Sequence, residues 1–325
     1  MKRIDTELLL LLLVTALVRL AYLWLVPEHA ISIDMQRWLK VAAFLREGKN
    51  PYVESSYLNA APFWMQFLFV LDGLARATGF ALLHLIQLFL IVVDLITVTV
   101  LYHALSERGQ GTRTLLLFGY ALNPVSIVLT IQHGQFDILL GLIILAFVLS
   151  LWRYLERSEP IEWLYSTFWL GVGIWAKTVP FVLLPLVTLK LRTLRPRWLV
   201  FGGIQLVLPV TIALSVIYVL SPSDVSTKVL GYVSVPGYFG ISGILGAVAS
   251  VEQFDALVKL CSQLFFALLL GSMVFVTAFI REREESLGYA KILLMATLLL
   301  ISLPALGPGY GPQYISWFLP LILLL

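Results

Sequence analysis

The sequence predicts an all-α polytopic membrane protein, and three observations support this prediction. Of its 325 residues, 60% are hydrophobic and only 13% are charged, with a mean hydropathy of +0.93. Soluble domains carry about twice that share of charged residues. Apolar runs of about 20 residues recur from end to end, and a helix of that length crosses the ~30 Å hydrocarbon core of a bilayer.

The first apolar run covers residues 8–26 and is expected to be a retained first span. It is too long for the hydrophobic region of a signal peptide, and no small-residue cleavage site follows it. Met1, Lys2 and Arg3 precede it, and the positive-inside rule therefore predicts a cytoplasmic N-terminus. The same rule places later basic residues on that side: Arg153, Arg157, Lys190, Arg192, Arg195, Arg197, Arg281 and Arg283.

Polar segments that are poor in lysine and arginine are expected to face outside. They are residues 27–61, the region around His133–Asp137, a turn near Lys177, residues 220–256 and residues 305–313.

The number of spans is harder to assign, because the charges and the apolar runs disagree. Spans over 60–78 and 80–103 would place the next loop outside, although it carries Arg108 and Arg113. A break at Pro124 that divides the following run into two short pieces would bring the number of crossings into agreement with the loop charges. We therefore expect a bundle of roughly nine to eleven spans.

The segment between Arg157 and Lys190 must leave the cytoplasm and return, yet it is too short for two full spans. We expect two short helices that meet at Ala176–Val179 and are buried against neighbours, since irregular backbone at membrane depth must line a cavity or pack on protein.

A single transmembrane domain over residues 1–325 is the simplest organisation, with external loops at 27–61 and 220–256. The chain ends inside an apolar run, which is compatible with a longer native protein. One cysteine, Cys261, excludes a disulfide framework, and four scattered histidines lack metal-ligand spacing. We expect no metal site and no cofactor, although assistance by a divalent ion stays open.

The first external loop opens with an amphipathic segment at residues 34–47. Its apolar residues recur at helical spacing on one face, namely Met35, Trp38, Leu39, Ala42 and Leu45, while its polar residues are on the other, namely Gln36, Lys40 and Glu47. Such a helix is expected to lie in the membrane interface, with Ser32 as its N-cap and Gly48 at its C-terminal end.

Asp34 begins this helix, and two interpretations stay open for it. A carboxylate in the first turn stabilises a helix through the macrodipole, by ~0.3–1 kcal/mol. Alternatively, Asp34 faces an outer cavity and accepts a proton from a hydroxyl group as a general base.

Six motifs occur in an order that resembles a known family. They are Asp34 with Trp38, GKNPY at 48–52, YLNAAPFW at 57–64, NPVSIVLTIQHGQFD at 123–137, GIWAKTVPFVLLPL at 173–186 and GYGPQYISWFLP at 309–320. Together they resemble the GT-C glycosyltransferases, which take sugars from polyprenyl-phosphate donors, and most of all their mannosyl- and glucosyl-transferring branch.

The resemblance implies a GT-C-like helical bundle with an external active site, in which Asp34 is the catalytic base. It also implies a lipid-linked donor, for which mannose is the favoured sugar. Relatives carry a His followed by an acidic residue near the last motif, whereas this chain has Gln313 and Tyr314 there. This departure bears on the identity of the sugar.

Several polar residues are candidates for holding the donor phosphate and sugar. Lys177, in the expected turn between short helices, offers a point charge to phosphate, unless it only extends to the surface. His133, Gln135 and Asp137 lie within five residues at an external helix end, where they could bind the donor or satisfy the helix terminus. Asp137 is also the second candidate for the base.

The glycine-rich segment GPGYGP precedes Gln313 and Tyr314, and it could cradle an anion or form an ordinary turn. Arg37 and Tyr52 could support the external site, and the 220–256 loop could cover it or bind the acceptor. The remaining charges in or beside apolar runs are expected to pair with one another for structural reasons: Arg19, Asp72, Arg76 and Asp94.

The sequence therefore favours an inverting hexosyltransferase of the cell (inner) membrane that acts on an acceptor hydroxyl. Its expected partners are a polyprenyl-phosphate sugar, a lipid-linked or glycan acceptor and membrane lipid, without nucleic acid. A lipid or polysaccharide transporter, or flippase, is the alternative, because broken helices with charges at depth also occur there.

Overall fold

The computed structural model describes residues 5–27, 30–55, 58–230, 240–248, 250–283, 288–307 and 311–325, and every regular element in them is a helix. Five stretches in this part of the chain are long and apolar enough to cross a membrane: Thr6–Leu25, Leu82–Ala104, Gln110–His133, Asp137–Arg157 and Gln253–Arg283. The prediction of an all-α polytopic membrane protein is confirmed. Residues 1–3 with the basic Lys2 and Arg3, Tyr57, residues 231–239 and residues 308–310 lie outside the described residues.

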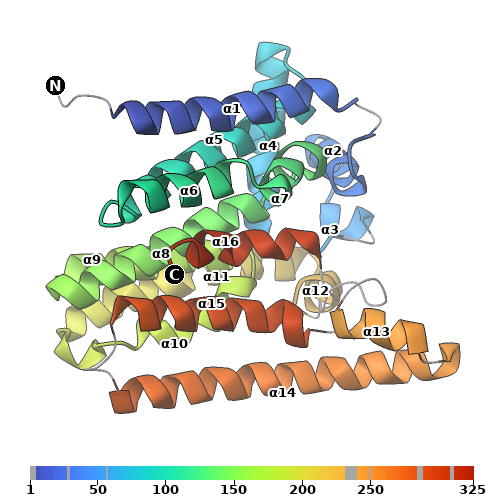
Figure 1. Cartoon of the computed structure of the whole chain (residues 1–325). Helices are drawn as coiled ribbons and strands as arrows, with labels where there is room; N and C mark the ends of the chain where they lie inside the picture. The colour runs from blue at the N-terminus through green and yellow to red at the C-terminus, as the bar shows by residue number, and fades with distance from the viewer. Residues whose placement is uncertain are drawn as a thin grey trace. The chain divides into compact units, whose positions relative to one another are not determined.

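The chain divides into two compact units, Met1–Leu142 with Ile315–Leu324 (unit 1) and Ile143–Tyr314 with Leu325 (unit 2). Figure 1 labels their helices along the chain. Unit 1 contains α1 (Thr6–Leu25), α2 (Ile33–Arg46), α3 (Pro51–Glu54), α4 (Pro62–Thr78), α5 (Leu82–Ala104), α6 (Gln110–Ala121), α7 (Pro124–Val128), the π-helix η2 (Leu129–His133) and α16 (Ile315–Ile322).

The chain passes from unit 1 into unit 2 within α8 (Asp137–Arg157). Unit 2 continues with α9 (Pro160–Ala176), η3 (Val179–Leu183), α10 (Leu184–Val187), η4 (Leu191–Thr193), α11 (Pro196–Leu220), α12 (Pro222–Asp224), η5 (Val225–Leu230), α13 (Gly240–Val248), α14 (Val251–Arg283), α15 (Tyr289–Leu306) and η7 (Pro312–Tyr314).

In unit 1 the beginning of α1 lies beside the end of α5 and the beginning of α6. The Tyr102 hydroxyl, near the end of α5, donates a hydrogen bond to the Asp5 carboxylate that caps α1. Arg113, in the first turn of α6, pairs with Glu7 of α1. The Arg113 loop therefore lies on the same side as the N-terminus, as its charge indicates.

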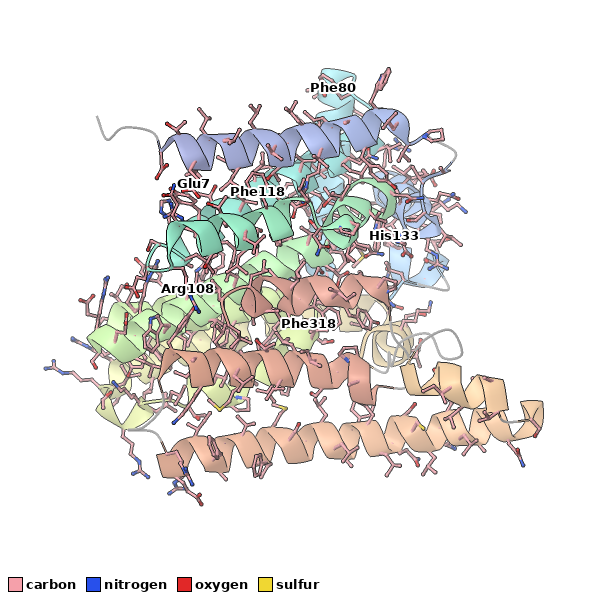
Figure 2. All side chains as sticks on the ribbon, viewed as in Figure 1. Glu7, Phe80, Arg108, Phe118, His133 and Phe318 are labelled. Atoms are coloured by element: carbon pink, nitrogen blue, oxygen red, sulfur yellow. The ribbon has the colours of Figure 1, made fainter. Side chains whose placement is uncertain are left out.

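The opposite ends of these helices also meet. Tyr22, near the end of α1, donates to the Gln132 side chain at 3.1 Å, and Gln87, near the start of α5, donates to the Ile131 carbonyl at 2.8 Å. Figure 2 shows Glu7 at one end of unit 1 and His133 at the other. The run Gln110–His133 thus crosses once, with Asn123 capping α7 at the Pro124 break.

This arrangement corrects the expected span over residues 60–78. Because α1 and α5 are antiparallel neighbours, the chain between them must begin and end on the same side, and α4 does not cross. Figure 1 shows α4 lying across the direction of α1 and α5, and its 17 residues are fewer than a typical span requires. The conflict between loop charge and span count is removed by α4 and not by two short pieces around Pro124.

A buried ion pair holds the spans of unit 1 together. Arg19 of α1 and Asp94 of α5 have no exposed side-chain surface, and their Nε and Oδ2 atoms are 2.7 Å apart. The Arg19 guanidinium also donates to the Ala121 carbonyl and to the Ser126 hydroxyl, each at 2.8 Å.

The Asp94 carboxylate, like the Arg19 guanidinium, has several hydrogen-bond partners within protein. Its carboxylate accepts hydrogen bonds from the hydroxyls of Tyr120 at 2.8 Å, Thr130 at 2.7 Å and Ser126 at 3.0 Å. A buried ion pair is tolerated in low dielectric only when additional hydrogen bonds satisfy both partners. The structural interpretation of Arg19 and Asp94 is therefore confirmed.

The predicted interfacial helix forms α2 with the expected ends. The Ser32 side chain accepts a hydrogen bond from the Met35 backbone N–H, and Gly48 ends the helix in the left-handed region at φ +69°. Met35, Trp38 and Ala42 are buried, and the expected polar face is exposed.

The predicted break in unit 2 is also confirmed. Helix α9 ends at Ala176, Lys177 is extended, and η3 begins at Val179. The returning piece, η3 with α10, buries Leu183 and Leu186 completely.

Glycine permits the close approach of α9 and α11. A Cβ on Gly171 would lie 2.3 Å from the Gln205 carbonyl oxygen, and one on Gly202 would lie 2.1 Å from the Trp163 ring. Small residues at such contacts are typical of helices packed inside a membrane.

The placement of α4 predicts which loops share a side of the membrane. In a Cys261→Ala background, cysteines at Lys49 and Thr78 should react with a membrane-impermeant maleimide from one side, and a cysteine at Glu107 should react from the other. Labelling of Lys49→Cys and Thr78→Cys from opposite sides of the membrane would show that α4 crosses.

Removing only the cation of the buried pair should be more harmful than removing both charges. Arg19→Leu leaves the Asp94 carboxylate buried without its cation, which should cost about 3–5 kcal/mol of unfolding free energy. Arg19→Leu with Asp94→Asn should cost less. Thermal unfolding in detergent measures this order, with the exposed Arg195→Leu as an unperturbed control, and equal losses in the single and double variants would contradict it.

Candidate functional site

The site in unit 1 is built where α2 meets the end of η2. The Ser32 backbone N–H donates to the Gln132 carbonyl at 3.0 Å, and the Ser32 hydroxyl donates to the His133 carbonyl at 3.3 Å. The Gln132 side chain donates in turn to the Ala30 carbonyl at 3.0 Å. These bonds fix the start of α2 against a segment a hundred residues later in the chain.

Gly134 allows the two segments to approach. It adopts φ +59°, a left-handed conformation that non-glycine residues rarely take, and it ends η2. A Cβ at this position would lie 2.1 Å from the methyl carbon of Met35. The conformation therefore favours glycine, and a larger residue would also force the end of the buried Met35 side chain to move.

Asp34 lies at this junction, in the first turn of α2. Its Oδ2 atom accepts a hydrogen bond from the Gln135 side-chain amide at 2.6 Å, and its Oδ1 atom lies 3.3 Å from an Arg37 guanidinium nitrogen. The His133 Nδ1 atom lies 4.0 Å from Oδ2. The structure thus brings Asp34 and Arg37 of α2 together with His133 and Gln135, which lie about a hundred residues later in the chain.

The Asp34 carboxylate is also accessible, with 26% of its side chain exposed. Each carboxylate oxygen can accept more than one hydrogen bond. A held but partly exposed carboxylate can therefore contact a hydroxyl group that approaches from the membrane interface.

An aromatic cluster packs around the turn of α2 that follows Asp34. The Trp38 ring, one turn after Asp34, lies 5.9 Å from Trp64 of α4 and 6.1 Å from Phe136, and Trp64 and Phe136 stack at 5.0 Å. Ring pairs at such distances add about 0.5–1.5 kcal/mol each beyond the area they bury. The cluster therefore packs α2, α4 and residues 133–137 against one another.

Asp137 is placed differently from its neighbours in sequence. Its side chain is completely buried at the start of α8, and its Oδ1 atom accepts the indole N–H of Trp317 at 2.5 Å. This position favours the role of satisfying a helix terminus and anchoring α16.

Tyr52 is buried as well and holds the loop that follows α3. Its hydroxyl donates to the Ala60 carbonyl at 2.8 Å, and burial raises the pKa of the Tyr52 phenol. Of the two supporting residues considered from the sequence, Arg37 contacts Asp34, whereas the Tyr52 hydroxyl bonds to Ala60.

The remaining candidates lie in unit 2 and form a second group. Lys177 occupies the extended position after α9, and its ammonium lies 5.5 Å from the centre of the Tyr314 ring. A lysine over an aromatic face is a cation–π contact. The side-chain amide of Gln313 lies next to the Cα atom of Gly311, at the end of the glycine-rich segment.

Comparison of the chain with protein-family models, with curated proteins and with solved structures finds no match. Within the described residues, no group of three or more histidine, cysteine, aspartate or glutamate side chains is arranged to hold a metal ion.

Sequence reasoning missed the residues that assemble the site. The sequence indicates Ser32 only as a helix cap, and it indicates no role of their own for Gln132, Phe136 and Trp317. All four lie within or beside the quoted motifs, and this adjacency was the available signal. Their partners in the site are about 70 to 180 residues away, so spacing along the chain could not identify them.

Gly134 should be intolerant of any side chain. Gly134→Ala should lower the unfolding free energy by about 2–4 kcal/mol, through left-handed strain and the clash with Met35. Gly119→Ala is a matched control, because a Cβ there meets nothing within 4 Å inside α6. Thermal unfolding should show a large loss of stability for Gly134→Ala and none for Gly119→Ala. Equal losses of stability in the two variants would contradict the role of Gly134.

Proposed function

We propose that this chain is an integral-membrane inverting glycosyltransferase of the cell (inner) membrane. It transfers a hexose, with mannose favoured, from a polyprenyl-phosphate donor to an acceptor hydroxyl on the external face. In this proposal the N-terminus is cytoplasmic. The support is the motif resemblance to GT-C enzymes together with the surroundings of Asp34.

The observation that carries the proposal is the Asp34 carboxylate, held by Gln135 at 2.6 Å and still 26% exposed. His133, whose Nδ1 atom is 4.0 Å from the Asp34 carboxylate, lies at the end of unit 1 opposite Glu7 in Figure 2, where polar head groups of a bilayer would be. Carboxylates that only stabilise a helix do not need a second side chain to orient them.

The proposed reaction is a displacement at the anomeric carbon. The acceptor oxygen forms a bond to this carbon while the bond from the carbon to the donor phosphate oxygen breaks, and Asp34 takes the hydroxyl proton. The phosphate leaves with the electron pair and becomes a dianion. A nearby cation stabilises the charge that develops on it.

Lys177 is assigned to the donor phosphate, with Tyr314 and Gln313 beside it in unit 2. His133 and Gln135 are assigned to the donor sugar or phosphate in unit 1. Asp34 and Lys177 belong to different units, and the roles proposed for them are tested separately.

A lipid or polysaccharide transporter is the second candidate function. The interruption of helix at Lys177 favours it, because transporters bind substrates at broken helices with charges at depth. Such a protein would move a labelled head group across the membrane without forming a new covalent bond.

Asp34→Asn should abolish transfer while leaving the fold intact. The purified full chain is supplied with radiolabelled polyprenyl-phosphate mannose, glucose or arabinose and candidate acceptors. Loss of a general base should slow transfer at least about 100-fold. Lys177→Gln should weaken donor binding, and Glu47→Gln, an exposed carboxylate at the end of α2, should be silent.

Normal transfer by Asp34→Asn would remove the catalytic role of Asp34. Movement of head groups by the unmodified chain, with no covalent transfer to any acceptor, would favour the transporter.

A further inference from the structure

The outward face of α4 is apolar, which is unusual for a short helix that does not cross the membrane. Phe69, Val70 and Leu74 are 52%, 63% and 47% exposed. They lie on one face at helical spacing with Gly73 and Ala77, since residues three, four and seven apart share a face. The residue that follows α4, Phe80, is also exposed and lies at its projecting end in Figure 2.

The level of α4 in the membrane follows from its neighbours. It packs against α2, the interfacial helix, and its end leads directly into the span α5. An exposed apolar face at this level is suited to acyl chains near the head groups rather than to water.

Two arginines and one buried carboxylate lie beside this face. The Asp72 side chain of α4 is only 6% exposed, and it lies 3.5 Å from a guanidinium nitrogen of Arg46 in α2 and 3.1 Å from one of Arg76 in α4. The Arg46 and Arg76 side chains are 47% and 55% exposed. Because one carboxylate faces two guanidiniums, the cluster carries an excess positive charge toward the surface.

We propose that Arg46 and Arg76 bind the phosphate group of a membrane phospholipid whose acyl chains lie along the apolar face of α4. A planar guanidinium presents several donors that match phosphate oxygens. Arg76 follows Phe69 by seven residues, or about two turns, and therefore projects from the same side of α4.

Asp72 supplies what an ordinary pair of surface arginines lacks. By contacting both guanidiniums it holds two long side chains together before the lipid binds, which lowers the entropy lost on binding. It also joins α2 to α4, so a bound lipid would stabilise the helix that carries Asp34.

A phospholipid accounts for both halves of the site. A free anion would use the arginines but leave the apolar face unexplained, and a second protein copy would cover the face without needing the excess charge.

The binding test is a titration of the full chain in detergent with phosphatidylglycerol, followed by native mass spectrometry. Loss of each charge-assisted hydrogen bond to the phosphate should weaken binding at least about tenfold, so Arg46→Gln with Arg76→Gln should weaken the tightest binding about 100-fold. The matched control, Lys40→Gln with Lys49→Gln, also removes two positive charges from α2 and its following turn but leaves Asp72 untouched, and it should retain binding within about twofold because exposed charges away from the phosphate are screened.

The triple variant Arg46→Gln, Asp72→Asn, Arg76→Gln removes the whole cluster without leaving a buried carboxylate unpaired. It should lose binding to the same extent, and it decides the result where the double variant fails to fold. If the lysine control weakens lipid binding as much as the arginine variant does, the binding depends on diffuse electrostatics. If millimolar inorganic phosphate displaces the lipid, the arginines form a site for a free anion. Either outcome overturns the proposal.

The position of the apolar face is tested in vesicles of phosphatidylglycerol and phosphatidylcholine. In a Cys261→Ala background, an environment-sensitive fluorophore at Val70→Cys should emit at shorter wavelength and be quenched by lipid-borne nitroxide. The same fluorophore at Lys40→Cys should be quenched by iodide. Quenching of Val70→Cys by iodide, or protection from both quenchers as expected for a protein partner, would contradict the lipid.

Discussion

The buried pair of Arg19 and Asp94 is the interaction on which unit 1 depends. An isolated charge at membrane depth is expensive, so each side chain must find every partner that it needs within protein. The partners come from α1, α5, the end of α6, α7 and η2, and hydrogen-bond geometry is much stricter than apolar contact. The pair therefore fixes the order, the depth and the rotation of these helices together.

The position of the candidate site follows from this constraint. With the spans held in register, η2 ends at the same level as the exit of α1, and the turn at Gly134 can pack on the start of α2. The Trp38, Trp64 and Phe136 rings fill the space beneath. Asp34 is then oriented by Gln135, whereas Asp137, only two residues further on, is buried against Trp317. The two carboxylates that the sequence offers as candidates for the base thus have different surroundings.

The sequence by itself determined the class of the fold and several local features. Apolar length and low charge required membrane helices, the pattern of Met35, Trp38 and Ala42 required an interfacial helix, and Ser32 and Gly48 marked its ends. The interruption at Ala176–Val179 was also readable, because too few residues separate the flanking basic clusters for two spans. Each of these features depends on neighbours within a few turns, where composition and spacing carry the information.

Only the tertiary structure decided which of the apolar runs crosses the membrane and which nominated residues meet. Residues 60–78 form an apolar run that the sequence predicts as a span, yet α1 and α5 are antiparallel, so α4 begins and ends on one side of unit 1. Likewise, the sequence nominated Asp34, His133, Gln135 and Asp137 together, but packing exposed the first and buried the last. Hydropathy measures the affinity of a segment for an apolar environment. Neighbouring protein and lipid both provide such an environment. The choice between them is made by contacts distant in sequence.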